Sequence, residues 1–243
     1  MVNGAAGFEN AAVTNLPKGT GNDFLKIFGP GYRAAFSDLA ALSSGPQASF
    51  DLMDCNGRLG LNITCAGVDA RIAADVHHYK SLPLVSGIGA YILSLAVNVL
   101  FKDIARPLRV TVNGDVWDQD ATILCVCNGR YYGGGFMPVG HALPDDGLLE
   151  VLLVPRVSRL TFFRLVRKYA AGKYADYPEL IRFYQTRDLT FSSPVPITVI
   201  IDGETMEDTS FTLRLSDKKV NFFYPEGLSY LPAGQRIDTQ DKF

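Results

Sequence analysis

Along most of the chain, apolar and polar residues alternate in short runs, the pattern of β-strands with one buried face. Runs of this kind that are bounded by turn residues predict strands at 49–53, 58–65, 108–112, 120–127, 148–154, 188–191, 197–201, 210–215 and 219–224. Asn113-Gly114 stands between two apolar runs and predicts a tight hairpin. We therefore expect residues 47–225 to form a domain that is rich in sheet.

The first 46 residues show a different pattern, in which helical and strand-like stretches alternate. Residues 2–5 are typical of a helix end, 12–16 of a short strand and 34–42 of a further helix. Asn22 is expected to cap a short helix that ends at Gly29. Because one strand cannot close an α/β sheet, residues 1–46 are expected to be the remnant of an α/β domain. The predicted fold class is α+β.

Two helices are expected to interrupt the sheet-rich part. Residues 84–101 form a run of eighteen without a charge, the lower edge of membrane-spanning length. The run contains two Gly, two Ser and an Asn, which favours a helix packed against protein. Residues 158–171 predict the second helix. Its cations are expected to form a solvated face or, alternatively, to meet anionic lipid headgroups; they are Arg164, Arg167, Lys168 and Lys173.

Composition and charge narrow the class of protein. The chain is 47% hydrophobic and 20% charged, as in ordinary globular proteins, and its net charge of −2 argues against a nucleic-acid partner. Its four cysteines lack further ligands at metal-binding spacing, so we expect reduced, structural thiols, which suit the cytoplasm. Cys125 and Cys127 alternate within one apolar run and should face the same side of a strand.

The clearest candidate for chemistry is the loop at residues 17–23, Pro-Lys-Gly-Thr-Gly-Asn-Asp, between a predicted strand and a predicted helix. Glycines let a backbone approach a phosphate, and a helix N-terminus offers free N–H groups and a positive dipole end. Thr20 and Asn22 add side-chain donors, and Asp23 can hold Mg²⁺ or its waters. An ordinary strand-to-helix turn is the alternative.

Three further turns carry residues with chemical potential. Asp202-Gly203-Glu204 follows an apolar strand, so it presents either a carboxylate base or a solvated hairpin. Asp145-Asp146-Gly147 precedes the strand at 148–154 and is typical either of a hard-cation site or of a polar turn. Three consecutive glycines at 133–135 indicate a ligand-contacting loop or a flexible link.

Taken in order, these features resemble the diacylglycerol kinase catalytic family, including its bacterial soluble lipid kinases. The resemblance covers nearly the whole chain. It rests on the loop at 17–24, Asp51 within a short strand, the segment Asn-Ile-Thr-Cys-Ala-Gly-Val-Asp-Ala at 62–70, the stretch at 128–135, the Asp-Asp-Gly element at 142–149 and Asp-Gly-Glu at 202–204.

The resemblance implies an α/β nucleotide-binding domain, then a β-sandwich-like domain, with the tail 226–243 returning to the first. It implies ATP- and Mg²⁺-dependent phosphorylation of a lipid hydroxyl, that of diacylglycerol or a related lipid. In such an enzyme Glu204 is the general base, and Asp23 and Asp51 belong to the network around the catalytic Mg²⁺. The nucleotide-binding residues are Gly19, Thr20 and Asn22.

A second, structural Mg²⁺ is implied at the Asp-Asp-Gly element, held by Asp146 with the backbone carbonyls of Leu143 and Leu148. The implied partners are ATP and a lipid at a membrane surface. A cytoplasmic protein peripheral to the membrane is therefore expected. The oligomeric state stays open, a homodimer included.

One signature of the family does not occur. Gly-Gly-Asp-Gly-Thr, expected shortly before Met1, is absent from the sequence. We therefore expect this chain to lack part of the nucleotide site and to be weakly active or inactive alone. The alternatives are a kinase for a sphingoid base or phosphatidylglycerol, a non-catalytic lipid-binding or regulatory module, and an NAD kinase, against which the Asp-Asp-Gly and Asp-Gly-Glu elements speak.

Overall fold

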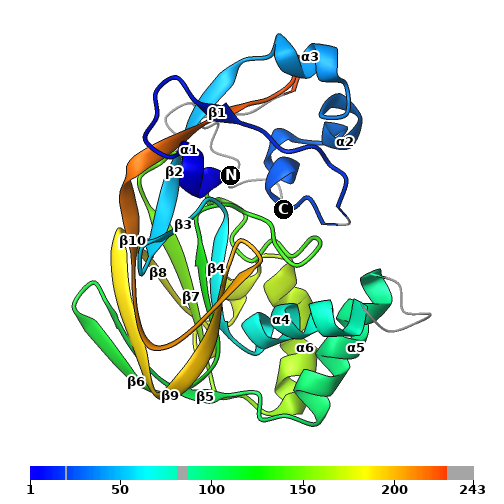
Figure 1. Ribbon diagram of the computed structural model, residues 1–243. Coiled ribbons are helices and arrows are strands. Elements are labelled where there is room, and N and C mark those ends of the chain that lie inside the picture. Colours follow the sequence, from blue (N-terminus) through cyan, green and yellow to red (C-terminus); the bar gives the residue numbers. More distant parts are fainter. Residues whose placement is uncertain (20, 81–86, 229–243) are drawn as a thin grey trace.

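The computed structural model describes residues 1–19, 21–80 and 87–228 (Figure 1). Thr20, one of the expected nucleotide contacts, lies outside the described residues, as does the expected returning tail beyond Leu228. None of the helices in the described part of the chain is long and apolar enough to cross a membrane. The uncharged run at 84–101 thus forms a shorter helix, in the part of it that is described.

The N-terminal part consists of short elements: α1 (Val2–Ala5), β1 (Ala12–Val13), the 3₁₀ helix η1 (Phe24–Phe28), α2 (Tyr32–Ala35) and α3 (Leu39–Ser43). The single helix expected at 34–42 is wrong. Asp38 starts a new helix there, because its carboxylate accepts the N–H groups of Ala40 and Ala41 at 3.0 and 3.2 Å.

The expected cap at Asn22 is also wrong. Asn22 has a left-handed backbone with φ of 50°, and its side-chain amide donates to the carbonyl oxygen of Gly19 at 2.7 Å. The residue that precedes η1 is instead Asp23, and its side chain caps no N–H group of that helix. Asn22 therefore closes the loop on itself, and Asp23 keeps its carboxylate for other contacts.

Nine further strands build the body: β2 (Gln47–Cys55), β3 (Arg58–Gly60), β4 (Ile63–Gly67), β5 (Arg106–Val112), β6 (Asp115–Cys127), β7 (Leu149–Pro155), β8 (Arg182–Thr186), β9 (Asp188–Ile201) and β10 (Glu204–Phe223). They run in the order β3-β2-β10-β9-β4-β6-β7-β8. Strand β5 pairs with both β6 and β9, so the sheet folds over and its layers enclose the largest apolar core. The expected α+β class with a β-sandwich-like part is confirmed.

The hairpin expected at Asn113-Gly114 joins β5 to β6, with φ of 51° and 84° as a type I′ turn requires. Other strands differ from expectation. The pairs predicted at 188–191 and 197–201, and at 210–215 and 219–224, each merge into one long strand, β9 and β10. Strand β10 absorbs its polar interruptions as register shifts near Ser210 and between Leu215 and Lys219. The strand expected at 58–65 breaks in two.

Among the described residues, three α-helices rather than two accompany the sandwich, with the short 3₁₀ helix η2 (Tyr174–Asp176) after the last of them: α4 (Val68–Lys80), α5 (Gly87–Leu100) and α6 (Arg159–Ala170). Figure 1 shows them gathered on one side of the sheet, where they enclose a second core. The helix expected at 158–171 is confirmed as α6, with Ser158 as its N-cap. Helix α4 was not expected, although Val68, Ile72 and Val76 recur every four residues on its buried face.

A third core, rich in aromatic rings, joins the N-terminal part to the sandwich. Phe28 of η1 and Phe36 pack with Phe222 of β10, and Phe24 packs edge-on against Phe50 of β2. Strands β2 and β10 therefore continue from the sandwich into the N-terminal part, as Figure 1 shows. The predicted boundary between residues 46 and 47 stays a prediction.

Candidate active site

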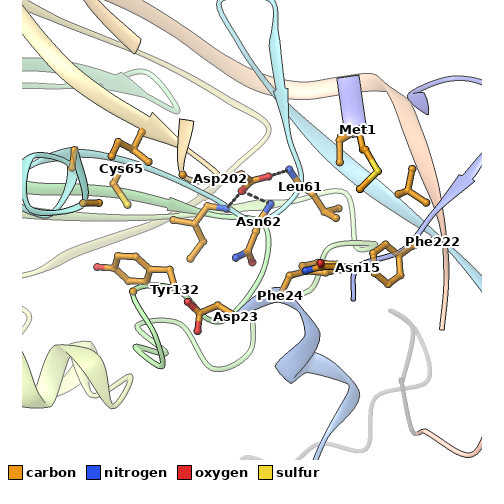
Figure 2. A pocket seen from close by; sticks show the side chains of 18 of the residues that line it. Met1, Asn15, Asp23, Phe24, Leu61, Asn62, Cys65, Tyr132, Asp202 and Phe222 are labelled. Carbon is orange, nitrogen blue, oxygen red and sulfur yellow. Dashed lines mark hydrogen bonds between the residues drawn. The ribbon is translucent and has the colours of Figure 1, made fainter. Parts of the chain in front are cut away.

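A cavity of about 460 Å³ lies between the N-terminal part and the sandwich (Figure 2). Seven separate stretches of chain line it: the first two residues, the end of β1 with the two residues after it, the start of η1, the residues from Leu61 into α4, the glycine-rich loop, the turn between β9 and β10, and Phe222 in β10. Its walls are largely apolar, with Phe24, Ile63, Ile200 and Phe222 among them. The polar side chains that line it include those of Thr14, Asn15, Asp23, Asn62, Asp69, Tyr132 and Asp202. An apolar chamber with a few convergent polar groups is typical of a small-molecule site.

Asp202 fixes one wall of this cavity. The Asp202-Gly203 pair is the type I′ turn between β9 and β10, with φ of 50° and 90°. The Asp202 carboxylate accepts the N–H groups of Leu61, Asn62 at 3.0 Å and Ile63 at 2.9 Å (Figure 2). It thereby supports the break between β3 and β4, which explains why the strand expected at 58–65 is interrupted. Asp202 is a structural residue of the site.

Two asparagines hold the next stretch of the wall. The Asn62 amide donates to the carbonyl oxygen of Tyr131 at 2.8 Å, and the Asn62 carbonyl accepts the N–H groups of Asn128 and Gly129, each at 2.9 Å. The buried Asn128 amide donates to the carbonyl oxygens of Leu61 at 2.6 Å and of Asp51 at 3.0 Å. These bonds position the glycine-rich loop beside the cavity.

Asp23 brings the loop at residues 17–23 to the same place. Its carboxylate accepts the N–H of Gly134 at 2.8 Å and forms an ion pair with Lys26. The Asp23 side chain is only 14% exposed and lines the cavity, as Figure 2 shows. The predicted phosphate loop and the three glycines, 111 residues apart at this bond, are therefore in direct contact. Sequence reasoning treated the two as separate features.

Asp51 lies elsewhere, against the Asp-Asp-Gly element. Its buried carboxylate accepts the N–H of Gly147 at 2.9 Å and pairs with Lys219 at 2.7 Å, and its own N–H donates to the carbonyl oxygen of Pro144 at 2.6 Å. Asp51 is not among the residues that line the cavity in the described structure. The structure therefore joins it to Asp146 and its loop rather than to Asp23.

The Asp-Asp-Gly element folds as a compact turn before β7. Asp146 accepts the N–H of Leu148 at 3.1 Å, Leu143 is buried and Leu148 is half-buried. A carboxylate and backbone carbonyls next to the buried Asp51 are hard oxygen donors, the set that Mg²⁺ and Ca²⁺ prefer. The donor types present thus fit the implied cation, and its ligation by Asp146 and the carbonyls of Leu143 and Leu148 stays a prediction.

Glu204 begins β10 two residues after Asp202. Its side chain is 67% exposed and its carboxylate pairs with Arg58 at 2.8 Å. Asp202 and Gly203 line the cavity, whereas Glu204 stands just beyond the lining residues. In this conformation the Glu204 carboxylate is therefore held in an ion pair with Arg58 at the edge of the site.

The structure adds polar residues for which the sequence predicted no role. Asp69, in the first turn of α4, accepts the N–H of Ala70 at 2.9 Å and faces the Tyr132 hydroxyl at 3.3 Å, which in turn lies 3.4 Å from that of Tyr169. Burial raises the pKa of Asp69 well above its ordinary value and nearby Cys125 adds to the rise, against the hydrogen bonds that lower it. The amphipathic spacing of 68–76 was the signal that could have placed Asp69 on a helix.

The cysteines behave as expected in one respect and not in another. All four are buried and free, Cys125 and Cys127 share one side of β6 with their sulfurs 3.7 Å apart, and burial raises the pKa of Cys55 to about 12. However, ligand atoms of Cys65, Asp69 and Cys125 lie within 4.8 Å of one another. The fold thus brings Asp69 to two thiols that looked isolated in the sequence.

Residues 62–224 match the family described as the YegS C-terminal NAD kinase beta sandwich-like domain. A protein of Pseudomonas aeruginosa named "Probable lipid kinase YegS-like" is 32% identical over 235 residues, which cover 96% of this chain and 75% of that protein. A protein of the same name from Shewanella frigidimarina is 26% identical over 211 residues, 86% of this chain and 66% of that protein. The chain therefore spans about two thirds of the length of such relatives.

A solved structure from Bacillus anthracis, described as a diacylglycerol kinase, superposes with a TM-score of 0.58 at 15% sequence identity. The match covers 90% of this chain and 68% of that chain. At this identity the likeness concerns the fold.

Proposed function

Because the chain belongs to the diacylglycerol kinase catalytic family, with its YegS-like lipid kinases, we propose that the complete protein transfers the γ-phosphoryl group of ATP to a lipid hydroxyl. The observation that carries the proposal is the contact between Asp23 and Gly134. This contact joins the loop at residues 17–23 to the glycine-rich loop, and both loops contribute residues to the lining of an apolar cavity, which supports a phosphate-binding role for them. The lipid is diacylglycerol or a related alcohol.

The residues of the chain supply positioning and charge. Phosphoryl transfer needs little covalent chemistry from a protein, so orientation of the reactants and neutralisation of charge dominate. Lys26 adds a cation beside Asp23, with which it forms an ion pair. The apolar wall that includes Phe24, Ile63 and Phe222 suits the part of a lipid next to its hydroxyl.

Asp23 would hold the catalytic Mg²⁺, and Asp146 with the carbonyls of Leu143 and Leu148 would hold the structural one. When bound, Mg²⁺ supplies the positive charge that offsets the negative charge on the phosphates. Asp51 would act from beside the structural site, since it is bonded to Gly147 and Lys219. Its role is to fix the Asp-Asp-Gly turn in place.

Glu204 is the proposed general base. It takes the proton of the lipid hydroxyl as that oxygen bonds to the γ-phosphorus, while the bond from the γ-phosphorus to the bridging oxygen breaks and ADP leaves. For this step the Glu204 carboxylate must leave Arg58 and turn toward the cavity edge formed by Asp202 and Gly203. An exposed ion pair of this kind costs at most about 1 kcal/mol to break.

The test is transfer of labelled phosphate from ATP to diacylglycerol in detergent micelles by the full-length protein. Glu204→Gln should lower kcat by roughly 100-fold or more, the usual contribution of a general base, with little change in stability. Sphingoid bases and phosphatidylglycerol in place of diacylglycerol separate the lipid classes. A Glu204→Gln protein with unchanged kcat would contradict the base assignment, and lipid binding without any transfer would favour a non-catalytic module.

A further inference from the structure

Large apolar side chains are exposed together on helices α5 and α6. Of the eleven large apolar side chains that are exposed in the described structure, five belong to these two helices and the residue after α5. Phe101 is 80% exposed and Leu160 is 60% exposed; the other three are Leu93, Leu100 and Phe163. A group of such side chains on one surface indicates an interaction site, whereas single ones need no explanation.

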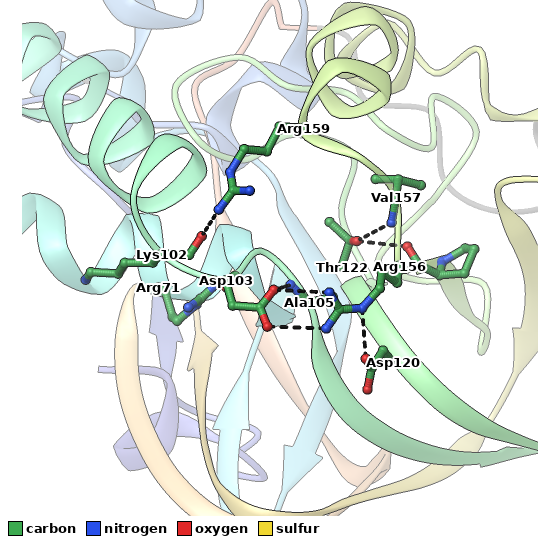
Figure 3. A network of polar contacts seen from close by, with 10 residues as sticks. Arg71, Lys102, Asp103, Ala105, Asp120, Thr122, Arg156, Val157 and Arg159 are labelled. Atoms are coloured by element: carbon green, nitrogen blue, oxygen red, sulfur yellow. Dashed lines mark hydrogen bonds and ion pairs between the residues drawn. The ribbon is translucent and has the colours of Figure 1, made fainter.

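A direct connection joins the end of α5 to the start of α6. The Arg159 guanidinium, at the start of α6, donates to the carbonyl oxygen of Lys102 at 3.1 Å (Figure 3). It also donates to the carbonyl oxygen of Val99 at 2.7 Å. A cation on the last carbonyls of α5 is also favoured by the helix dipole. Leu160 therefore lies beside the end of α5, where Leu100 and Phe101 are exposed. We call the surface formed by Leu93, Leu100, Phe101, Leu160, Phe163, Arg164, Arg167 and Lys168 the α5–α6 face.

Helix α6 is divided sharply into two sides. Phe162 and Tyr169 are buried in the core between the helices and the sheet. The residues on the opposite side, spaced by three and four, are exposed: Leu160, Phe163, Arg164, Arg167 and Lys168. An apolar pair followed by three cations on a single helix face is the composition of helices that lie in a membrane interface.

The charge of α6 is unusual for this chain. The helix carries four cations and no acid, although the whole chain has a net charge of −2. Arg164, Arg167 and Lys168 form no ion pair within the described residues. By contrast Arg156, just before α6, is paired with Asp103 and Asp120, as Figure 3 shows. The cations of the α5–α6 face are thus left for a partner.

The exposed apolar side chains and the cations that are unpaired among the described residues together indicate which kind of partner the α5–α6 face binds. If two copies of the protein associated through this face, the cations of one copy would face the cations of the other, and their repulsion would oppose association. A membrane with anionic lipids offers both an apolar interior and negative headgroups. We propose that the α5–α6 face docks the protein on an anionic lipid surface, with Leu100, Phe101, Leu160 and Phe163 at the headgroup boundary and the cations on the phosphates. The docking proposal depends on the proposed function only for its biological role, which is to bring the cavity to a lipid substrate in the membrane.

The test is sedimentation of the full-length protein with vesicles in the absence of ATP. The protein should bind vesicles of equimolar phosphatidylcholine and phosphatidylglycerol far more tightly than vesicles of phosphatidylcholine alone. Because each cation near an anionic surface contributes about fivefold, Arg164→Gln with Arg167→Gln should weaken binding by about thirtyfold. Leu160→Ser with Phe163→Ser should weaken it by at least about tenfold. Arg109→Gln with Arg182→Gln, the same change of charge on exposed sheet positions, should leave binding unchanged.

Each result decides one question. Equal binding to both kinds of vesicle, or equal loss in the Arg109/Arg182 control, would overturn the docking proposal. So would an α5–α6 variant that binds vesicles normally but loses a dimer in sedimentation equilibrium, because the face would then be a contact between copies. Activity on a dispersed short-chain diacylglycerol is measured on the same variants. It should persist in all of them, and its absence in the parent protein would refute the kinase proposal while leaving the docking result intact.

Discussion

Asp202 and Ile63 hold each other by two hydrogen bonds: the Asp202 N–H donates to the Ile63 carbonyl oxygen at 3.0 Å, and the Ile63 N–H donates to the Asp202 carboxylate at 2.9 Å. The pair joins the β9–β10 turn to the start of β4. The first acid of Asp-Gly-Glu thus shapes the cavity wall, and the second, Glu204, is the acid left for chemistry.

Asp202→Asn should destabilise the fold while leaving its outline intact. Three backbone N–H groups would lose a charged acceptor, and an amide nitrogen would face donors, so we expect a loss of about 2–4 kcal/mol in the free energy of unfolding. Urea denaturation followed by circular dichroism measures it. Glu204→Gln is the matched control, because its exposed ion pair with Arg58 contributes no more than about 1 kcal/mol. Equal stability of the two variants would show that the three bonds contribute little.

Gly129→Ala should disturb the same wall by crowding. A Cβ at Gly129 would lie 2.1 Å from Oδ1 of Asn62, whose amide holds Tyr131. Overpacking of this kind costs about 1–3 kcal/mol, and the loop that reaches Asp23 should shift with it. The unfolding temperature and the lipid-kinase activity should both be lower than in the parent protein. Gly4→Ala is the matched substitution, because a Cβ there meets nothing within 4 Å; a comparable loss in that variant would contradict the explanation.

Mg²⁺ should raise the unfolding temperature through Asp146. At ten times the dissociation constant, a ligand bound only to the folded state adds about 1.4 kcal/mol, which is roughly 3–5 °C for a chain of this length. Asp146→Asn should abolish the shift without lowering the unfolding temperature measured in EDTA. Asp118→Asn, which removes an exposed acid from β6, should keep it. A shift that survives Asp146→Asn would place the cation elsewhere.

Asp69 and Asp75, six residues apart on α4, should give stability opposite dependences on pH. The folded pKa of Asp69 is raised, so the folded state binds its proton more tightly and stability falls as pH rises from about 4 toward that pKa. Partial burial raises the pKa of Asp75, but hydrogen bonds from Lys102 and Asn98 bring it below its ordinary value, so stability falls as pH decreases through the folded pKa.

Urea denaturation between pH 3 and 8 separates the two effects. Asp69→Asn should flatten the decline of stability above about pH 4, and Asp75→Asn should flatten the decline on the acid side. Identical pH profiles for the Asp69→Asn variant and the parent protein would mean that the Asp69 carboxyl is already well hydrated.

Local signals predicted much of this fold. Asn113-Gly114 marked its hairpin because a type I′ turn needs two left-handed residues, and Ser158 marked the start of α6 because its side chain accepts the N–H of Thr161. Features that depend on distant contacts were not predictable in this way. The break at Leu61–Asn62 exists because Asp202, about 140 residues away, accepts its N–H groups.

In the candidate site too, local motifs were predictable and contacts between distant residues were not. The residues expected at the site could be named from motifs, yet only the fold shows that Asp23 meets Gly134 while Asp51 meets Gly147. Spacing alone could not distinguish those two neighbourhoods, because the partners lie 111 residues from Asp23 and 96 residues from Asp51 along the chain. Asp69 belongs to the segment at 62–70 on which the resemblance rests, but no role was predicted for it. It lies on α4, whose buried positions Val68, Ile72 and Val76 follow the spacing of an amphipathic helix.

Strands β2 and β10 run side by side from the sandwich into the aromatic core of the N-terminal part, paired from Cys55 to Gln47. The two halves of the cavity are thus connected by a ladder of backbone hydrogen bonds rather than by a linker. Any opening of the cavity must therefore bend strands β2 and β10, and the bend will concentrate where their pairing is already interrupted, between Leu215 and Lys219. Lys219, which forms an ion pair with Asp51, is the first residue after this interruption.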